Sequence, residues 1–298
     1  MSGAKDYIAS PAVVAYAGRQ GIDLADVARR SGRTALARED VDNHMGKAPV
    51  AAGSADDSRF WTVDHAAFGP VSQQPMSRIA KVAAANLSAA NRMIPQVTHH
   101  DRADMRSVEA FRKRLRPEGE SRGVRLTALS FHVMALARCL REFPLFNSSL
   151  SADGETLILK HYVHVGIAVD TPHGLVVPVI RDADRKGLWA IARDLADLAG
   201  KAQARKLRPE EIGGASMSIS NLGGIGGTAF TPIVNPPEVA ILGITRTETV
   251  PVWEGESCMP VPMAPLDLSY DHRVANGADA ARFLARYASL LGDIRRLL

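Results

Sequence analysis

The sequence predicts a layered α/β domain preceded by a small helical domain. Two observations predict the α/β domain: runs that are apolar on both faces, as at 163–169, share the region with amphipathic helical segments, as at 127–143. A third observation is the shift to Ala, Gly, Ser and Asp without periodicity at 46–65, which predicts a flexible linker. The expected domains are therefore residues 1–45, 46–65 and 66–298.

Two short helices are expected in the N-terminal domain. Ser10 and Pro11 have the types favoured at an N-cap and at the first helical position, and Gly21 is a typical helix stop. A second helix is expected at 38–44.

The elements of the large domain follow from periodicity. Apolar spacing predicts helices at 79–87, 108–116, 127–143 and 189–206, and a further helix that starts at Asn276-Gly277. Strands are expected at 97–101, 163–169, 175–180, 215–220 and 266–270, and a turn at 152–154 joins two more.

The bulk composition excludes several classes of protein. The 298 residues carry a net charge of +4, but both signs are interspersed, so nucleic-acid binding is not indicated. There is no apolar run long enough to span a membrane, and the first residues do not resemble a signal peptide. Cys139 and Cys258 lie far apart, which suits a reducing compartment. We expect a cytoplasmic protein in which both cysteines are buried.

A histidine at a strand end is the leading candidate for chemistry. His272 follows the alternating run 266–270 and is flanked by Asp271 and Arg273. An imidazole with a pKa near 6.5 is mostly neutral at neutral pH and can accept a proton. The alternative is structural: Asp271 and Arg273 form a surface ion pair, Asn276 caps the next helix, and His272 is a polar turn residue.

The segment around His272 resembles a family signature. Asp271-His272-Arg273 followed by Asn276-Gly277 is similar to the active-site motif Asp-His-Arg-x-x-(Asp/Asn)-Gly of the acyltransferase components of 2-oxo acid dehydrogenase complexes. Their catalytic domain is built like chloramphenicol acetyltransferase. From about residue 68 to 298 the chain is most similar to the acetyltransferases of bacterial pyruvate dehydrogenase complexes, in the blocks 78–81, 85–88, 94–99, 144–150, 166–172, 218–223 and 237–243.

The resemblance implies a two-layer α/β catalytic domain that transfers an acetyl group between dihydrolipoamide and coenzyme A. His272 would be the general base, and Ser220 would donate a hydrogen bond to the tetrahedral oxyanion. Asn276 stands where many relatives carry aspartate, and an amide can orient a ring but adds no charge. By position, the coenzyme A contacts would be Arg112, Thr127, Asp170, Ser220, Asn221 and Gly243.

The resemblance also implies partners. A homotrimer would share each site between two subunits, and the C-terminal segment 294–298, with leucines expected to be exposed, would join trimers into a cubic core. The lipoyl group would come in trans or from a longer chain, because Lys47 lies in the expected linker without flanking strands. A catalytically weak structural core subunit is the rival interpretation.

The N-terminal region resembles the domain of this family that binds the peripheral subunits, pyruvate dehydrogenase and dihydrolipoamide dehydrogenase. The two arginines expected to anchor such a partner are replaced by Val14 and Ala35. Arg29, Arg30 and Arg33 could substitute, since an acidic partner needs guanidinium groups near the right place. Loss of docking is the equally open alternative.

Three other motifs fail a physical test. The pattern Gly-x-Gly-x-x-Ala at 224–229 is followed by prolines, so the helix that dinucleotide binding requires cannot form. The segment 214–218 lacks the last glycine of a serine-hydrolase elbow. His99 and His100 are adjacent on an expected strand, so their side chains point to opposite faces and cannot bind one metal ion. His161 and His164 are an odd number of positions apart on a strand, so the same objection applies to them. No metal site is predicted.

Overall fold

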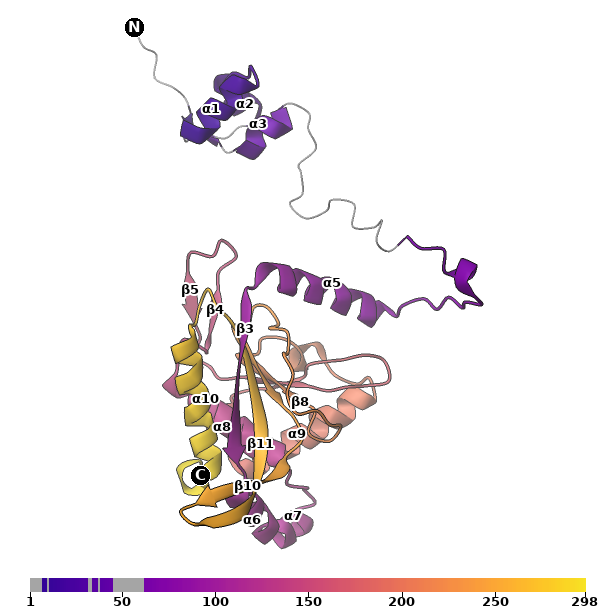
Figure 1. Cartoon of the computed structure of the whole chain (residues 1–298), viewed down its shortest axis with the longest axis vertical. Helices are drawn as coiled ribbons and strands as arrows, with labels where there is room; N and C mark the ends of the chain where they lie inside the picture. The colour runs from indigo at the N-terminus through magenta and orange to yellow at the C-terminus, as the bar shows by residue number, and fades with distance from the viewer. Residues whose placement is uncertain (1–6, 10, 32–33, 37, 45–61) are drawn as a thin grey trace. The chain divides into compact units, whose positions relative to one another are not determined.

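The computed structural model describes residues 7–9, 11–31, 34–36, 38–44 and 62–298. The chain divides into two compact units, Met1–Gln74 and Pro75–Leu298 (Figure 1). Lys47 and most of the expected linker at 46–65 lie outside the described residues. The three expected domains therefore stay predictions. None of the described helices is both long and apolar enough to cross a bilayer.

The N-terminal unit contains three short helices, α1 (Pro11–Arg19), α2 (Leu24–Ser31) and α3 (Arg38–His44). Strands β1 (Ile8–Ala9) and β2 (Ala35–Leu36) form a parallel pair. The helices α1 and α3 confirm the prediction, whereas α2 is absent from it. In α2 only Leu24 and Val27 are buried, too few apolar positions to show a period. Asp23 caps this helix, since its Oδ1 accepts from Ala25 N at 2.9 Å.

The large unit is built on a seven-stranded mixed sheet (Figure 1). The order is β10-β11-β9-β8-β6-β7, with β3 on the other side of β11. Strands β6, β8 and β9 are parallel neighbours, and the remaining pairs are antiparallel. The bounds are β3 Gln96–Asp104, β6 Val165–Ala168, β7 Val179–Ile180, β8 Met217–Asn221, β9 Ala240–Ile244, β10 Glu248–Glu254 and β11 Ser257–Asp271.

A separate hairpin of β4 (Ser148–Leu150) and β5 (Leu157–Leu159) confirms the turn expected at 152–154.

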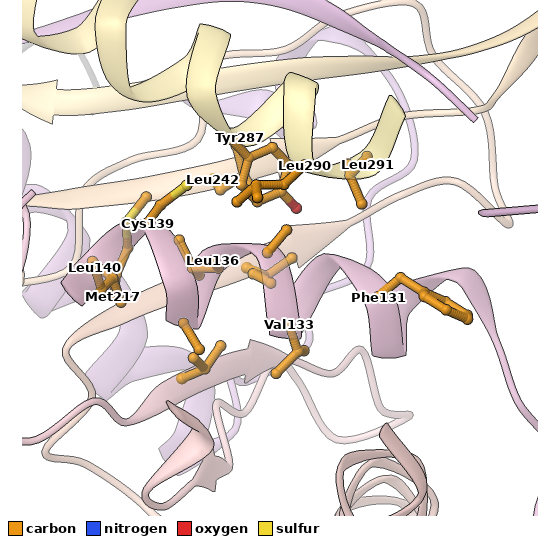
Figure 2. Close-up of a cluster of buried hydrophobic side chains, with 14 of the residues drawn as sticks. Phe131, Val133, Leu136, Cys139, Leu140, Met217, Leu242, Tyr287, Leu290 and Leu291 are labelled. Atoms are coloured by element: carbon orange, nitrogen blue, oxygen red, sulfur yellow. The ribbon is translucent and has the colours of Figure 1, made fainter. Parts of the chain in front are cut away.

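Helices cover one face of this sheet. The core joins sheet residues to α8 (Ala128–Glu142), α9 (Leu188–Gln203) and α10 (Gly277–Gly292). Figure 2 shows side chains of α8, such as Leu136, next to those of α10, such as Tyr287 and Leu290, and near strand residues such as Leu242 and Met217. This arrangement confirms the layered α/β prediction. The other helices are α5 (Arg78–Met93), α6 (Arg106–Arg114) and α7 (Arg116–Ser121), with 3-10 turns at His65–Phe68, Ala183–Arg185, Pro209–Glu211 and Ile294–Arg296.

Strand alternation separates the apolar from the polar side chains. Ile219, Leu242 and Leu268 are register neighbours and belong to the core beneath the helices. The residues next to them, Ser218 and Ser220 among them, therefore point to the opposite face. There the segment 222–239 contributes Val234 to a small cluster with Ile94 and Ile241.

Several element predictions are wrong in their bounds. The expected helix at 79–87 is longer, at Arg78–Met93, and the expected strand at 266–270 is the end of the longer β11. The expected strand at 175–180 is reduced to Val179–Ile180, because the rest of the segment forms isolated bridges, Val169 to Val176 and Pro178 to Ile212, and not a continuous ladder. The expected helix at 108–116 ends at Arg114, and α7 begins at Arg116 with a proline in its first turn.

Two burial predictions are also wrong. Cys139 is buried in α8, as expected, but Cys258 is exposed near the tip of the β10–β11 hairpin, paired with Trp253. Leu297, expected to be exposed, is only 7% exposed and packs in the core, so Leu298, at 59%, is the exposed leucine of the C-terminal segment.

Candidate functional site

The turn that carries His272 is held by backbone hydrogen bonds and by a buried carboxylate. Asp271 N donates to Val239 O, and His272 N donates to Pro95 O at 3.1 Å. The Asp271 carboxylate is buried and accepts from the Arg273 backbone N–H and from its guanidinium, with the shortest contact at 2.6 Å. His272 itself is exposed, so its ring is available to a substrate or to a neighbouring chain.

Asn276 is the N-cap of α10. Its Oδ1 accepts from Ala278 N at 2.9 Å and from Asp279 N at 3.0 Å, and the Asp279 carboxylate accepts from Asn276 N. This capping box satisfies donors at the start of the helix. In the described part of the chain, the oxygen of Asn276 is therefore engaged by the helix, and no hydrogen bond joins Asn276 to His272.

Ser220 lies far from His272 within one chain. Ser220 pairs with Gly243, and Gly243 pairs with Asp267 on β11, whereas His272 follows the end of β11. The separation is roughly 16 Å along the strands and about 10 Å across two strand spacings, or roughly 19 Å in all. One chain alone cannot place both side chains on one reacting group.

A cavity of about 420 Å³ brings together three of the predicted coenzyme A residues. Thr127, Asp170 and Asn221 line it, where the start of α8 faces α9 and the end of β6. Asn221 is on the helix side of β8, whereas Ser220 points to the other side and is not among the residues that line the cavity.

A second cavity, of about 900 Å³, contains Arg112 and is rich in cations. Lys113, Arg116 and Arg125 line it too, against the carboxylates of Glu109 and Glu120. Arg112 is already paired with Glu109 at 2.5 Å. Arg125 lines both cavities and was not among the sequence candidates, because it lies in an irregular segment with no periodic signal.

Gly243 is packed rather than open to a cavity. A Cβ on Gly243 would lie 2.6 Å from Phe230 Cε1 and 3.1 Å from Asp267 Cβ. Only a glycine leaves room for the Phe230 ring at this position, which is a structural reason for this residue. The structure therefore groups Thr127, Asp170 and Asn221, but it does not place Gly243 with them.

A buried carboxyl group on the non-helical face has no counterpart among the sequence candidates. Glu238 Oε1 accepts from Ser218 Oγ at 2.9 Å and from Asn235 Nδ2 at 3.3 Å. Burial raises the pKa of Glu238 to about 7, although these hydrogen bonds and the charge of Lys160 favour its ionised form. Among the described residues Oε2 is buried without a hydrogen-bond partner. A glutamate just before an apolar strand was the only signal in the sequence.

No three His, Cys, Asp or Glu side chains gather in a way that could hold a metal ion in the described ranges. His99 and His100 do face opposite sides of β3, because His99 pairs with Leu268 of the core face and His100 with Asp267.

Comparison with known proteins identifies the family. A family model described as the catalytic domain of 2-oxoacid dehydrogenases acyltransferase matches residues 69–298. The dihydrolipoyllysine-residue acetyltransferase component of the pyruvate dehydrogenase complex of Pseudomonas aeruginosa is 47% identical, over 97% of this chain and 54% of that protein. The same component of Azotobacter vinelandii is 45% identical, over 100% of this chain and 48% of that protein. The chain thus spans about half the length of the curated relatives it matches.

Solved structures agree with this assignment. The cubic core of a pyruvate dehydrogenase multienzyme complex matches with a TM-score of 0.78 and 50% identity, over 79% of this chain and 97% of that chain. The Azotobacter vinelandii dihydrolipoamide acetyltransferase, studied for the role of a serine, a histidine and an asparagine in its catalytic mechanism, gives the same values. The chain belongs to the family of 2-oxoacid dehydrogenase acyltransferases.

Proposed function

We propose that this chain transfers an acetyl group between dihydrolipoamide and coenzyme A in the core of a pyruvate dehydrogenase-type complex. One observation carries the proposal: Ser220, His272 and Asn276 have the same spacing along this chain as the serine, histidine and asparagine studied in the Azotobacter vinelandii enzyme. High identity across the whole catalytic domain supports it.

His272 is the proposed general base. A free thiol has a pKa of about 8.5, so the base removes its proton as the sulfur attacks the thioester carbonyl. The carbonyl oxygen becomes an oxyanion, and the Ser220 hydroxyl, which has no hydrogen-bond partner within the described residues, donates to it. When the intermediate collapses, the leaving thiolate takes the proton back from His272. Asn276 supports this chemistry by capping α10 and fixing the turn that holds His272.

The roughly 19 Å between His272 and Ser220 supports a site shared by two subunits. We infer a homotrimer in which the His272 of one chain faces the Ser220 of its neighbour, and trimers that join into a cubic core like that of the structural relative. A monomer would then be inactive.

Coenzyme A is proposed to occupy the two cavities that Arg125 joins. The narrower one, with Thr127, Asp170 and Asn221, suits the uncharged arm, and its residue Asn221 directly follows Ser220 on β8. The wider one, with Arg112 and Lys113, has the cations that phosphate groups require. The lipoyl group would come from another chain or from a longer form of this one.

The N-terminal unit is proposed to be a weakened docking domain for pyruvate dehydrogenase and dihydrolipoamide dehydrogenase. Val14 is exposed at 44% where an anchoring arginine is expected. Arg29 and Arg30 lie in α2, but Arg29 is paired with Asp26, and Arg33 is outside the described residues. We further propose a cytoplasmic location.

The test is an assay of the purified chain with acetyl-CoA and dihydrolipoamide. His272→Ala should lower the rate by about 10²–10⁴-fold, the usual contribution of a general base. Mixing His272→Ala with Ser220→Ala subunits should restore activity at hybrid sites that carry both native residues. A rate for His272→Ala within about threefold of the parent would refute the assignment of the base. Hybrids that stay inactive after verified subunit exchange would refute the shared site.

A further inference from the structure

A row of register neighbours crosses the sheet on the face opposite the helices. Ser220 on β8 pairs with Gly243 on β9, Gly243 with Asp267 on β11, and Asp267 with His100 on β3. Residues that are directly paired in a sheet point to the same face. Ser220 therefore shares its face with Asp267 and His100, and only Gly243 separates it from Asp267.

The ring of Phe230 fills the space above Gly243. A Cβ there would lie 2.6 Å from Phe230 Cε1 and 2.8 Å from its Cζ. Adjacent strands are about 5 Å apart, so the ring stands roughly that far from the Ser220 side chain. An acyl group whose carbonyl oxygen is bound by Ser220 would meet the edge of this ring.

Asp267 connects the Phe230 backbone to His100. The carboxylate is 1% exposed, and its Oδ1 lies 2.6 Å from His100 Nδ1, whereas its Oδ2 accepts from Phe230 N at 3.3 Å. The contact fixes a proton on Nδ1 of the imidazole, because a carboxylate can only accept. The contact with His100 also fixes the orientation of the Asp267 carboxylate. It thereby keeps Oδ2 in place as the acceptor for the Phe230 N–H.

The segment that carries Phe230 has other attachments on both sides. Thr245 Oγ1 donates to Thr228 O at 3.2 Å, and Val234 N donates to Gln96 Oε1 at 3.0 Å. Loss of the Asp267 contact would therefore release the ring locally without detaching the whole segment.

We propose that Asp267 and His100 are positioning residues that hold the Phe230 ring beside Ser220 and thereby restrict the transferred acyl group to a short one. The proposal rests on the proposed function, since it takes Ser220 as the donor to the oxyanion. The ring limits the space for the acyl chain, and the Asp267–His100 pair determines how firmly the ring keeps its place.

The test compares kcat/KM for acetyl-CoA and butyryl-CoA with dihydrolipoamide as acceptor. Phe230→Ala should raise the butyryl-to-acetyl ratio by about tenfold or more, since each methylene in an apolar pocket changes selectivity by that order. Asp267→Asn keeps the volume but removes the negative charge and one of the two acceptor oxygens, and it should raise the ratio by about twofold to tenfold. In the Phe230→Ala background the same change should leave the ratio unmoved.

His100 provides a second variant that leaves the carboxylate in place. His100→Phe should raise the ratio, and His100→Asn, whose amide can donate where Nδ1 does, should restore it toward the parent value. His99→Phe is the matched control, because this neighbour faces the other side of β3.

The possible failures are distinct. If the parent is active but Asp267→Asn and His100→Phe both keep its butyryl-to-acetyl ratio, this inference alone is overturned. The same holds if the variants lose kcat/KM equally for both substrates. An Asp267→Asn effect that persists without the Phe230 ring would also overturn it. A parent that transfers no acetyl group to dihydrolipoamide would overturn the proposed function as well.

Discussion

Replacing Glu238 with glutamine should change how the stability of the folded chain depends on pH. Glu238 is 5% exposed, and burial raises the pKa of its carboxyl from 4.5 to about 7. The folded chain therefore holds this proton more tightly than the unfolded chain does. The resulting stabilisation is complete below about pH 4.5 and is lost as pH rises through about 7.

The size of the effect follows from the two pKa values. Each pKa unit corresponds to about 1.4 kcal/mol, so ionisation of Glu238 costs about 3 kcal/mol once pH is well above 7. Glutamine keeps the oxygen that accepts from Ser218 and Asn235 and carries no charge at any pH. The free energy of unfolding of Glu238→Gln, minus that of the parent, should rise by about 3 kcal/mol between pH 4.5 and 8.

Urea unfolding followed by far-ultraviolet circular dichroism at several pH values, at one fixed protein concentration, measures this difference. Glu155→Gln is the matched control, because Glu155 is exposed beside the β4–β5 turn. A difference for Glu238→Gln that stays constant across this pH range, as expected for the control, would show that folding does not raise the pKa of this carboxyl. The burial argument would then be wrong.

Two further predictions concern assembly and docking. Leu298→Ala should weaken the association of trimers in sedimentation with little change in Tm, because Leu298 is exposed. Leu297→Ala should cost about 2–4 kcal/mol of folding stability, because Leu297 is buried. Equal Tm values for the two variants would contradict this assignment. In calorimetry the unmodified chain should bind dihydrolipoamide dehydrogenase weakly. The double change Val14→Arg with Ala35→Arg should strengthen this binding. Tight binding by the parent would show that the arginines of α2 or Arg33 already provide the contact.

Long periodic segments were predictable from the sequence, and short or partner-dependent ones were not. The helix expected at 127–143 is found at Ala128–Glu142, because Val133, Leu136 and Leu140 repeat with the helical period and all three are buried. The strand at 175–180 fails, because an apolar run shows only that a segment is buried, not that a neighbour pairs along its length.

Cys258 and Leu297 show the same limit for burial. A cysteine is usually buried, but Cys258 is exposed near the tip of the β10–β11 hairpin, which its own composition does not reveal. Leu297 was expected to be exposed as part of a terminal leucine patch that joins trimers, yet it follows the 3-10 turn Ile294–Arg296 and packs in the core. Both errors come from tertiary context that local sequence does not encode.

The geometry of the candidate site could not be predicted from the sequence. The family resemblance indicated His272, through the signature, and Ser220, through its position, but only the strand register shows that they lie at opposite ends of the sheet. The contacts of Asp267 and Glu238 were not predictable either, because each joins segments far apart in the chain.

The signature around His272 contains structural contacts that suit the chemical role proposed for the histidine. Asp271 and Arg273 form the ion pair of the structural interpretation, but its carboxylate is buried and holds the turn. Asn276 caps α10, again as that interpretation expects. These contacts fix the backbone before and after His272 and leave its ring exposed, which is what a base that must reach into a neighbouring subunit requires. The structural interpretation of the flanking residues therefore supports the catalytic interpretation of the histidine between them.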